Sequence, residues 1–277
     1  MRAAVYEGRG GKARAGNGGG FVRKEEGKEE LIEGRNPVLE ALKAGLPLKE
    51  ILVAHGTRGR ELEALLALAE AGRIPVSYRE RAYLDRLAKT GRHQGVIARG
   101  SLPATRSLED LFAAAESKGE APLFLLAAGV EDPRNLGSIV RTAEAAGAHG
   151  LIIPERRAAG LTAVVARASA GALYHLPVAE VKNTVRAMEE LKKRGCWLAG
   201  ADMHGTPLWQ ESFDFTAPVC LVLGGEGKGL PRLVRETCDL LVGIPQRGKV
   251  GSLNVSVAAG IILYEVVRRR TQALSRS

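Results

Sequence analysis

The sequence predicts an α/β protein with two domains, because two separate stretches alternate short apolar segments with amphipathic helical ones. The first alternation covers residues 29–100, the second covers residues 122–277, and a linker is expected at 101–121. In the second stretch the apolar segments are almost continuous, which is typical of parallel strands buried on both faces. We therefore expect a small N-terminal α/β domain followed by a larger domain built on a parallel sheet.

The first 28 residues are expected to form a flexible basic tail. This segment contains eight glycines and few apolar side chains, so it cannot bury a core of its own. Seven Lys or Arg stand against three Glu in it, and the whole chain carries a formal net charge of +9. A charge of this sign favours phosphate-rich partners such as nucleic acids. The tail either contacts such a partner nonspecifically or is a solvated extension.

The smaller domain is predicted from helix and strand signals that alternate over residues 29–100. Asn36 and Pro37 are typical of a helix start, and Gly45 ends that helix. A second amphipathic segment ends at Gly72 in the same way. In chain order we expect a helix at 36–44, a strand at 51–54, a helix at 61–71, a strand at 74–78, a helix at 81–89 and a strand at 95–98.

The larger domain is predicted from six apolar segments, most of them separated by helical ones. The linker before it contains Pro103 and a short helix at 108–117. Ligands of parallel sheets bind at the carboxyl ends of strands, so chemistry is expected in the loops that follow residues 127, 223 and 244. The expected strands lie at 123–127, 151–154, 176–181, 197–201, 218–223 and 240–244, and a long final helix runs from 253 to 271.

The first of these loops spans residues 131–138 and leads into a helix that carries Arg141. Pro133 and Gly137 favour a turn, and the side-chain oxygen of Asn135 is expected to cap the helix. An arginine on a helix is usually a solvated surface residue. Here the residues that follow it are mostly small, which favours close packing of the helix and makes this long cation a candidate for function.

The second loop runs from Leu223 to Leu230 and contains four glycines in six consecutive positions. Glycines leave the backbone N–H and C=O groups accessible to a ligand. The phosphate-loop pattern is absent because Lys228 is followed by Gly229, and the dinucleotide fingerprint does not fit either, so a nucleotide-hydrolysing enzyme is disfavoured. The alternative interpretation is a flexible turn with Glu226 facing water.

The third loop connects the strand that ends at Ile244 to the final helix. Ser252, Asn254 and Ser256 are spaced two residues apart in a segment that is otherwise fit for burial. The ordinary interpretation makes Ser252 an N-cap and Asn254 a polar residue of the first turn. Three polar side chains exceed what capping requires, so this loop is also a candidate binding segment.

Taken in this order, the three loops resemble the motifs of the SpoU branch of the SPOUT methyltransferases, over residues 122–271. The motifs are Asp-Pro-Arg-Asn-Leu-Gly with Arg-Thr, Gly-Gly-Glu-Gly-Lys-Gly, and Ser-Leu-Asn-Val-Ser-Val-Ala. The segments 33–38 and 93–96 are similar to the substrate-binding domain of that branch, which resembles an RNA-binding ribosomal protein in fold. Residues 169–172 and 175–178 most resemble enzymes that methylate a guanosine of large-subunit (23S-type) ribosomal RNA.

This resemblance implies S-adenosylmethionine-dependent 2′-O-methylation of RNA, with a tRNA guanosine or an rRNA adenosine as alternative substrates. It also implies a deep trefoil knot formed by the second and third loops, and a homodimer through the C-terminal domain. The implied catalytic residues are Arg141, Glu226, Ser252 and Asn254. The cofactor would be bound, largely through backbone atoms, by Leu223, Gly224, Gly225, Ile244, Gln246, Leu253 and Asn254. The implied RNA contacts are Asn135, Arg35, Asn36 and His93.

One position departs from the family pattern, because relatives commonly have Met after Ile-Pro in the third motif, where this chain has Gln246. An apolar cofactor contact would be lost there, whereas a backbone contact would survive. The three cysteines are far apart and form no metal-ligand pattern, so no metal is expected. We expect a cytoplasmic protein without a membrane segment. A non-catalytic RNA-binding factor of ribosome assembly is the alternative from another functional class.

Overall fold

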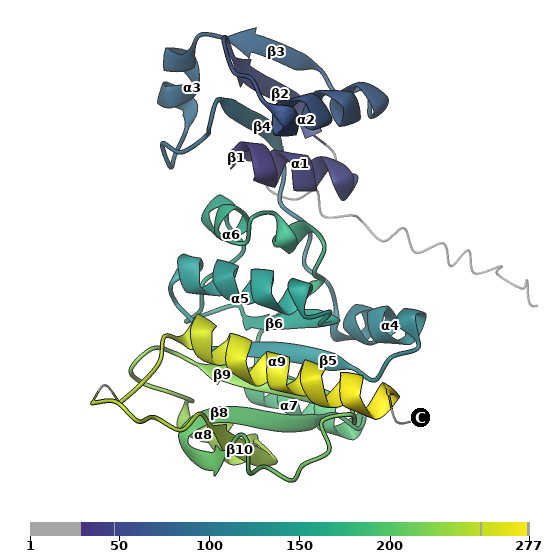
Figure 1. The fold of residues 1–277 in the computed structure, drawn as a ribbon, viewed down its shortest axis with the longest axis vertical. Coiled ribbons are helices and arrows are strands. Elements are labelled where there is room, and N and C mark those ends of the chain that lie inside the picture. Colours follow the sequence, from purple (N-terminus) through teal and green to yellow (C-terminus); the bar gives the residue numbers. More distant parts are fainter. Residues whose placement is uncertain (1–28, 47, 250, 276–277) are drawn as a thin grey trace, which may run out of the picture.

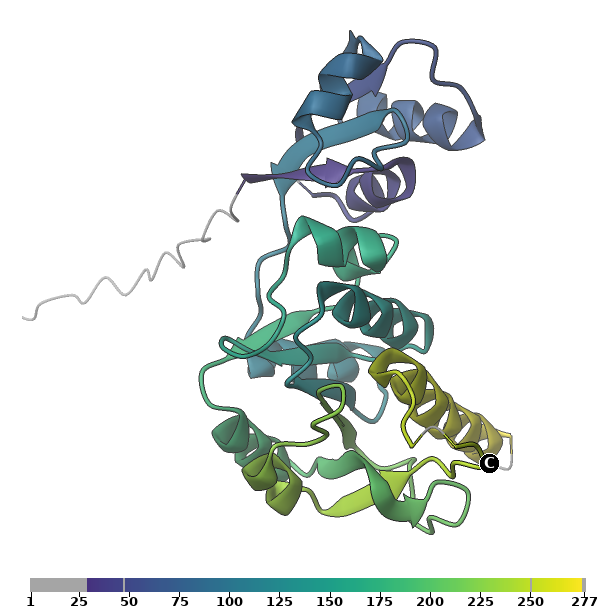
Figure 2. The same ribbon diagram turned by 90° about the vertical axis from the view of Figure 1, so that its left-hand side faces the viewer.

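The structure is a computed structural model that describes residues 29–275 except for 47 and 250. The predicted basic tail at 1–28 lies outside the described residues. Figures 1 and 2 show two α/β units arranged end to end along the long axis of the molecule. The N-terminal unit lies at the top of both views, and the C-terminal unit, with its larger sheet, lies below it.

The N-terminal domain contains a mixed four-stranded sheet with strand order β1-β4-β2-β3. Three of its strands were expected, whereas β1 was not, because its sequence Glu-Glu-Leu-Ile-Glu has a single pair of apolar residues. Residues of α1 and α2 pack on one face of the sheet, and Leu84 of α3 packs on the other. The elements are β1 (Glu29–Glu33), α1 (Arg35–Lys43), β2 (Leu48–Ala54), α2 (Arg60–Ala71), β3 (Val76–Arg79), α3 (Arg81–Leu87) and β4 (Val96–Ser101).

The C-terminal domain contains a six-stranded sheet whose strand pairs are all parallel, as the continuous apolar segments predicted. The strand order is β10-β8-β9-β5-β6-β7, so the direction of winding reverses between β5 and β9. Ligands of such sheets bind where the order reverses, at the carboxyl ends of the strands. The strands are β5 (Leu123–Ala128), β6 (Gly150–Pro154), β7 (Val178–Val181), β8 (Trp197–Pro207), β9 (Val219–Gly224) and β10 (Leu240–Gly243).

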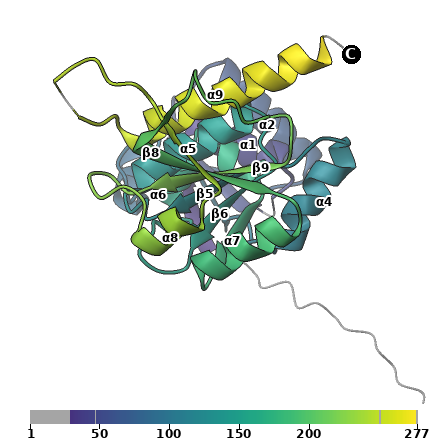
Figure 3. The ribbon, with the colours of Figure 1, turned by 90° about the horizontal axis from the view of Figure 1, so that it is seen from below.

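Helices cover both faces of this sheet, and Figure 3 shows α9 on one side of the strands with α7 and α8 on the other. The first side holds α5 (Pro133–Ala145), α6 (Ala163–Ala168), the short 3-10 helix η1 (Ala172–Tyr174) and α9 (Val255–Leu274). The second side holds α4 (Leu108–Lys118), α7 (Thr184–Lys193) and α8 (Arg232–Thr237). The helix expected inside the linker, α4, therefore packs through Leu108 and Leu111 on the sheet of the C-terminal domain.

The two domains meet where α1 lies against the segment between α6 and β7. Tyr174 packs against the apolar clusters of both domains. His175 Nε2 contacts Glu40 Oε2 on α1 at 3.0 Å. Gly171 has a φ of 94°, and a Cβ atom there would lie 2.3 Å from the Cβ of Glu40. A glycine is required at this position because its φ is left-handed and because the Cβ of Glu40, which is fixed to the backbone of α1, leaves no room for a side chain.

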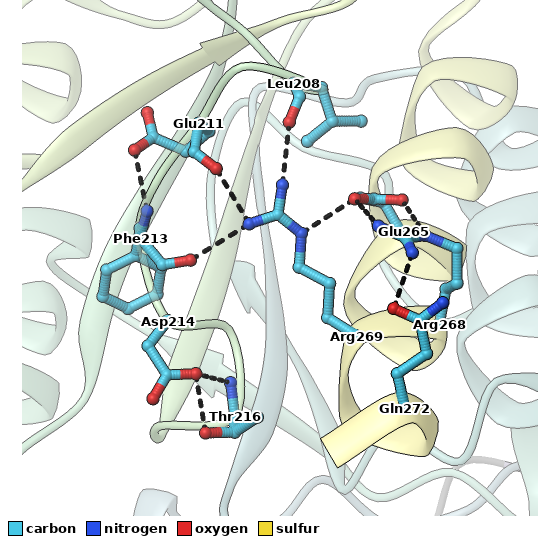
Figure 4. A network of polar contacts seen from close by, with 9 residues as sticks. All are labelled: Leu208, Glu211, Phe213, Asp214, Thr216, Glu265, Arg268, Arg269 and Gln272. Carbon is cyan, nitrogen blue, oxygen red and sulfur yellow. Dashed lines mark hydrogen bonds and ion pairs between the residues drawn. The ribbon is translucent and has the colours of Figure 1, made fainter. Parts of the chain in front are cut away.

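The last turns of α9 are anchored by two adjacent arginines. Arg269 donates to the carbonyl oxygens of Leu208, Glu211 and Phe213 and to Glu265, as Figure 4 shows. Charge-assisted hydrogen bonds of this kind are stronger than neutral ones. Arg270 donates in the same way to the carbonyl oxygens of Ala121, Pro122, Phe215 and Ala217.

Candidate active site

The loop after β9 is pressed against the loop after β5 at the carboxyl ends of these neighbouring strands. A Cβ atom at Gly225 would lie 2.5 Å from the carbonyl oxygen of Gly129. One at Gly224 would lie 2.3 Å from the carbonyl carbon of Gly229. Gly225 and Gly229 also exchange two backbone hydrogen bonds of 3.1 and 3.0 Å. Glycine is required at both positions because the neighbouring atoms belong to the backbone and cannot rotate aside.

A cavity of about 600 Å³ opens at this edge of the sheet, and the loops after β9 and β10 form much of its wall. Its volume is in the range of cofactor sites. The wall combines apolar side chains, such as Val242 and Ile262, with the bare backbone of the glycine loop. It includes eight of the residues singled out from the sequence: Leu223, Gly224, Gly225, Glu226, Ile244, Gln246, Ser252 and Leu253.

Asn254 joins the three loops through its side-chain amide. Its Nδ2 donates to Asn135 Oδ1 at 2.9 Å and to Glu226 Oε1 at 2.6 Å, so each loop supplies one member of the cluster. Its Oδ1 accepts from the backbone N–H of Ser256 at 2.9 Å and from the Ser256 hydroxyl at 2.6 Å. An asparagine amide offers two donor hydrogens and two acceptor lone pairs, so all four are used. The amide is therefore held in one orientation.

Two details of the predicted loops are wrong. The N-cap of α5 is Asp132, whose carboxylate accepts from the N–H of Arg134 at 2.7 Å, and it is not Asn135. Because Pro133 is already the first helical residue, Asn135 lies in the first turn and its side chain bonds to Asn254 instead. The final helix begins at 255 rather than 253, and its N-cap is Asn254 rather than Ser252.

Gln246, which departs from the family pattern, lines the cavity and bonds to the backbone of its own loop. Its Nε2 donates to the carbonyl oxygen of Ile244 at 3.0 Å. The side chain is exposed, so a polar amide lies at the position where an apolar side chain was expected from relatives. The backbone N–H of Ile244 is not involved in this bond and can still contact the cofactor, as predicted. The carbonyl oxygen of Ile244 already accepts one hydrogen bond, from Gln246.

Arg141 lies on α5, about 9 Å along the helix axis from Asn135. Its side chain is exposed and, among the described residues, makes no hydrogen bond or ion pair. Nearby, α5 crosses α9 closely enough that a Cβ at Gly260 would lie 3.5 Å from Thr142 Cγ2. Within one chain the structure therefore does not join Arg141 to the cluster around Asn254.

Two of the three predicted RNA contacts in the N-terminal domain lie at a cavity, and the third, His93, does not. Arg35 and Asn36 line a second cavity, of about 450 Å³, together with Glu61, Arg81 and Gln94. The guanidinium of Arg35 donates to the carbonyl oxygens of Gln94 and Arg58, both at 3.1 Å. The wall of this cavity consists of charged and amide side chains, which suit the phosphates and base edges of RNA.

The prediction that His93 contacts RNA is wrong in this structure, because only 1% of the residue is exposed. Its Nδ1 accepts from the N–H of Gly95 at 3.0 Å, and its Nε2 lies 2.8 Å from Asp85 Oδ1. Since Nδ1 is an acceptor, the proton of the neutral ring is on Nε2, which donates to Asp85. Both ring nitrogens thus have partners inside the domain.

The sequence interpretation missed the part of the cavity wall that β8 and α8 supply. Asp202, Met203 and His204 from β8 and Arg235 from α8 line the cavity. Burial raises the pKa of Asp202, but hydrogen bonds from Arg235 and from the backbone of His204 hold it below its ordinary value. These residues belong to no motif, although Gly200 of β8 pairs with Val222 of β9, which places residues 202–204 beside the carboxyl end of β9.

Neither a metal site nor a membrane segment is found in the described part of the chain. Within it, no three His, Cys, Asp or Glu side chains come together as potential metal ligands. None of the helices in the same residues combines the length and the apolar content that a bilayer crossing requires. All three cysteines are free thiols, and Cys196 and Cys220 are buried.

Comparison with known proteins identifies the family. The SpoU rRNA Methylase family matches residues 122–264, and the RNA 2′-O ribose methyltransferase substrate binding family matches residues 31–105. A Bacillus subtilis protein assigned to the TrmH family of tRNA/rRNA methyltransferases, YacO, is 46% identical over 243 residues, which cover 88% of this chain and 97% of the relative.

Two solved structures share the fold over almost the whole described chain. The SpoU methyltransferase AviRb from Streptomyces viridochromogenes, in complex with AdoMet, has 31% identity and a TM-score of 0.73, covering 88% of this chain and 91% of that one. The AdoMet-bound rRNA methyltransferase from Sinorhizobium meliloti has 26% identity and a TM-score of 0.71, covering 87% of each chain. This chain therefore belongs to the SpoU family of RNA methyltransferases.

Proposed function

We propose that this protein transfers a methyl group from S-adenosylmethionine to a ribose 2′-hydroxyl of RNA, and that the ribose belongs to a guanosine of large-subunit rRNA. The observation that carries the reaction is the cluster of Asn135, Glu226 and Asn254 beside the cavity. Segments far apart in the chain supply these three side chains, and each segment is one of the family motifs. A hydrogen-bonded cluster of this kind, next to a cofactor-sized cavity, is suited to orienting a reacting group.

The residues of the cavity suit this cofactor. An adenine ring needs apolar walls and backbone hydrogen-bonding groups, which Leu223, Ile244 and the glycine loop offer. A sulfonium cation is stabilised by a nearby carboxylate, and Glu226 lines the wall. The relatives from Streptomyces viridochromogenes and Sinorhizobium meliloti hold AdoMet in their structures.

When bound, S-adenosylmethionine supplies a methyl group on a positively charged sulfur. The protein aligns the ribose hydroxyl and stabilises the charge that develops on its oxygen as the proton leaves. We assign this electrostatic role to Arg141, because a guanidinium does not act as a base near neutral pH. Arg141 also binds a neighbouring phosphate of the RNA. The proton of the ribose hydroxyl passes to that phosphate or to water. Asn254 and Glu226 organise the site around the hydroxyl.

Two observations favour structured ribosomal RNA as the substrate. The chain has a separate N-terminal domain that matches the substrate-binding family, and its cavity is lined by charged and amide side chains. The residues 169–178, which prompted the choice of a large-subunit guanosine, lie where the two domains meet. The relative from Sinorhizobium meliloti is named an rRNA methyltransferase. The name of the Bacillus subtilis relative covers both tRNA and rRNA, so tRNA is the second candidate.

We also propose that the protein is a homodimer through the C-terminal domain. Leu253, Val257 and Tyr264 are 38%, 51% and 50% exposed. Val257 and Tyr264 are seven residues apart and so lie on one face of α9, and Leu253 lies just before the N-cap of that helix. Arg141 lies on α5, which packs beside α9. A second copy on this face would cover its apolar surface and bring Arg141 to the subunit interface. Val257→Arg is expected to shift the protein from dimer to monomer in analytical ultracentrifugation.

We infer, in addition, that the loops after β9 and β10 thread to form a trefoil knot. The support is topological: β10 lies at the edge of the sheet, and the chain then returns so that α9 packs on α5 and β9. Stretching the protein from its two ends in an optical trap tests this. A knotted chain unfolds to a shorter length than its residue number allows, whereas full extension would refute the knot.

The reaction is tested by incubating the protein with labelled S-adenosylmethionine and unmodified bacterial RNA, followed by mapping of 2′-O-methyl nucleotides. We expect a guanosine signal in large-subunit rRNA that Arg141→Ala abolishes. A signal confined to tRNA would retain the mechanism and replace the substrate. Binding of RNA without any methyl transfer would refute the proposal and favour a non-catalytic assembly factor.

A further inference from the structure

The wall of the large cavity contains a cation that no family motif supplies. Arg235 of α8 lines the cavity, and its Nε donates to Asp202 Oδ2 at 2.7 Å. Asp202 is itself fixed, because its Oδ1 accepts from the backbone N–H of His204 at 2.8 Å and its side chain is 12% exposed. The arginine is thus attached to a carboxylate that cannot rotate freely.

This attachment leaves one edge of the guanidinium available. Asp202 occupies only Nε, and neither terminal nitrogen of Arg235 bonds to any residue that the structure describes. The side chain is 47% exposed. Two adjacent N–H groups on the terminal nitrogens match the geometry of a carboxylate, which they bind through a pair of parallel hydrogen bonds.

S-adenosylmethionine carries a carboxylate on its methionyl part, which needs a partner when the cofactor enters the cavity. We propose that Arg235, oriented by Asp202, binds the carboxylate of the methionyl group of the cofactor. This inference rests on the proposed function, since it assumes that the cavity takes S-adenosylmethionine. It makes Arg235 a cofactor-binding residue and Asp202 a positioning residue outside the three motifs.

A second cation, Lys228, also lines the cavity at the tip of the glycine loop. Lys228 is exposed, and no side chain in the described part of the chain orients it. An ammonium on a flexible stem loses more conformational freedom on binding than a guanidinium that is already fixed. The geometry therefore favours Arg235 as the partner of the carboxylate.

The competing explanation is that the Arg235–Asp202 pair merely ties α8 to the end of β8. The two explanations differ in which ligands they affect. A structural role predicts that Arg235→Gln weakens every ligand of the cavity equally. A direct contact predicts a loss only for ligands with the carboxylate, which decarboxylated S-adenosylmethionine lacks while it keeps the sulfonium and the amine.

The test is calorimetric titration of the full chain with S-adenosylmethionine and with its decarboxylated analogue. We expect Arg235→Gln to weaken the first ligand by about 5- to 20-fold, the range of a charge-assisted pair that is half exposed. The dissociation constant of the analogue should stay within about twofold, which is below the effect of one neutral hydrogen bond. Asp202→Asn should give a smaller loss with the same dependence on the carboxylate.

Arg232→Gln is the matched control, because Arg232 lies on the same helix, is 81% exposed and, among the residues that the structure describes, pairs with Glu236 alone. It should change neither dissociation constant. Equal weakening of both ligands by Arg235→Gln, or no weakening of either, would overturn the inference. So would a carboxylate-dependent loss in Lys228→Gln that Arg235→Gln lacks. If the unmodified protein binds neither ligand, the proposed function fails as well.

Discussion

Asn254 has two separate roles, as the N-cap of α9 and as the residue that joins the three loops, and replacing it by alanine removes both. Loss of an N-cap costs about 1 kcal/mol. The bonds from Nδ2 to Asn135 and Glu226 are exposed, so together they add about 1–2 kcal/mol at the lower end of the range for neutral and charged hydrogen bonds. We therefore expect Asn254→Ala to lower the free energy of unfolding by about 2–3 kcal/mol.

Asn183 provides a matched control, because it is also an asparagine N-cap on an exposed helix end. Its Oδ1 accepts from the N–H of Arg186 at 3.0 Å, and it caps α7, which lies on the other side of the sheet from α9. Asn183→Ala should cost only the capping energy of about 1 kcal/mol. For a domain of this size, 1 kcal/mol lowers Tm by about 2–4 °C. Thermal unfolding should thus separate the two variants by several degrees.

The functional assay is single-turnover methyl transfer at a temperature where both variants are folded. Asn254→Ala should lower kcat/KM by about 10- to 100-fold, since each tenfold corresponds to 1.4 kcal/mol of lost orientation. Asn183→Ala should leave kcat/KM unchanged. The reasoning is refuted if both variants lose stability equally and retain the same activity, because Asn254 would then be a cap and nothing more.

Three further outcomes are expected. Arg141→Ala should lower kcat by about 10²- to 10³-fold, as for other single electrostatic groups. Arg141→Lys should retain clearly more activity than Arg141→Ala. Equal loss of activity in both variants would contradict a purely electrostatic role. Gly225→Ala should weaken S-adenosylmethionine binding by more than about tenfold in calorimetry, because its Cβ would lie 2.5 Å from the carbonyl oxygen of Gly129; unchanged binding would show that the two loops separate easily. The hydrogen bond from Arg268, joined by that from Arg269, lowers the pKa of Glu265 to about 2 from an ordinary value of 4.5. Since this stabilisation is present above pH 4.5 and is lost as pH falls towards 2, the Tm deficit of Glu265→Gln should shrink over that window, and a constant deficit would refute it.

The pattern of apolar segments was sufficient to predict the parallel sheet and most helix positions. Strands such as β5 and β9 are buried along their whole length, so their sequences are continuous apolar runs. By contrast, β1 was missed because it pairs with β4 at the edge of its sheet and carries three glutamates in five residues. No bounds were predicted for the short helix α6, because six residues are too few to show a helical period.

The loops of the candidate site were predicted from the sequence, whereas the contacts between these loops were not. The loops that hold Glu226 and Asn254 were found from glycine content and polar spacing. The hydrogen bond from Asn254 to Asn135 spans 119 residues of sequence, and no spacing rule predicts it. Arg235 and Asp202 were missed because a charged residue on a helix or strand is normally solvated, and only the sheet order brings these two to the cavity.

The arginines at the end of α9 have a consequence for the order of events during protein synthesis. Arg270 bonds to Ala121 and Pro122, which precede it by 149 and 148 residues and lead into β5, a central strand of the sheet. The carbonyl oxygen of Pro122 also accepts from the N–H of Val219 at 3.0 Å, whereas that of Ala121 has no other partner among the described residues and keeps water until the last turns of α9 have left the ribosome. The C-terminal domain therefore completes its hydrogen bonding only after residue 270 has left the ribosome, so the strand that begins the sheet waits for the helix that ends it.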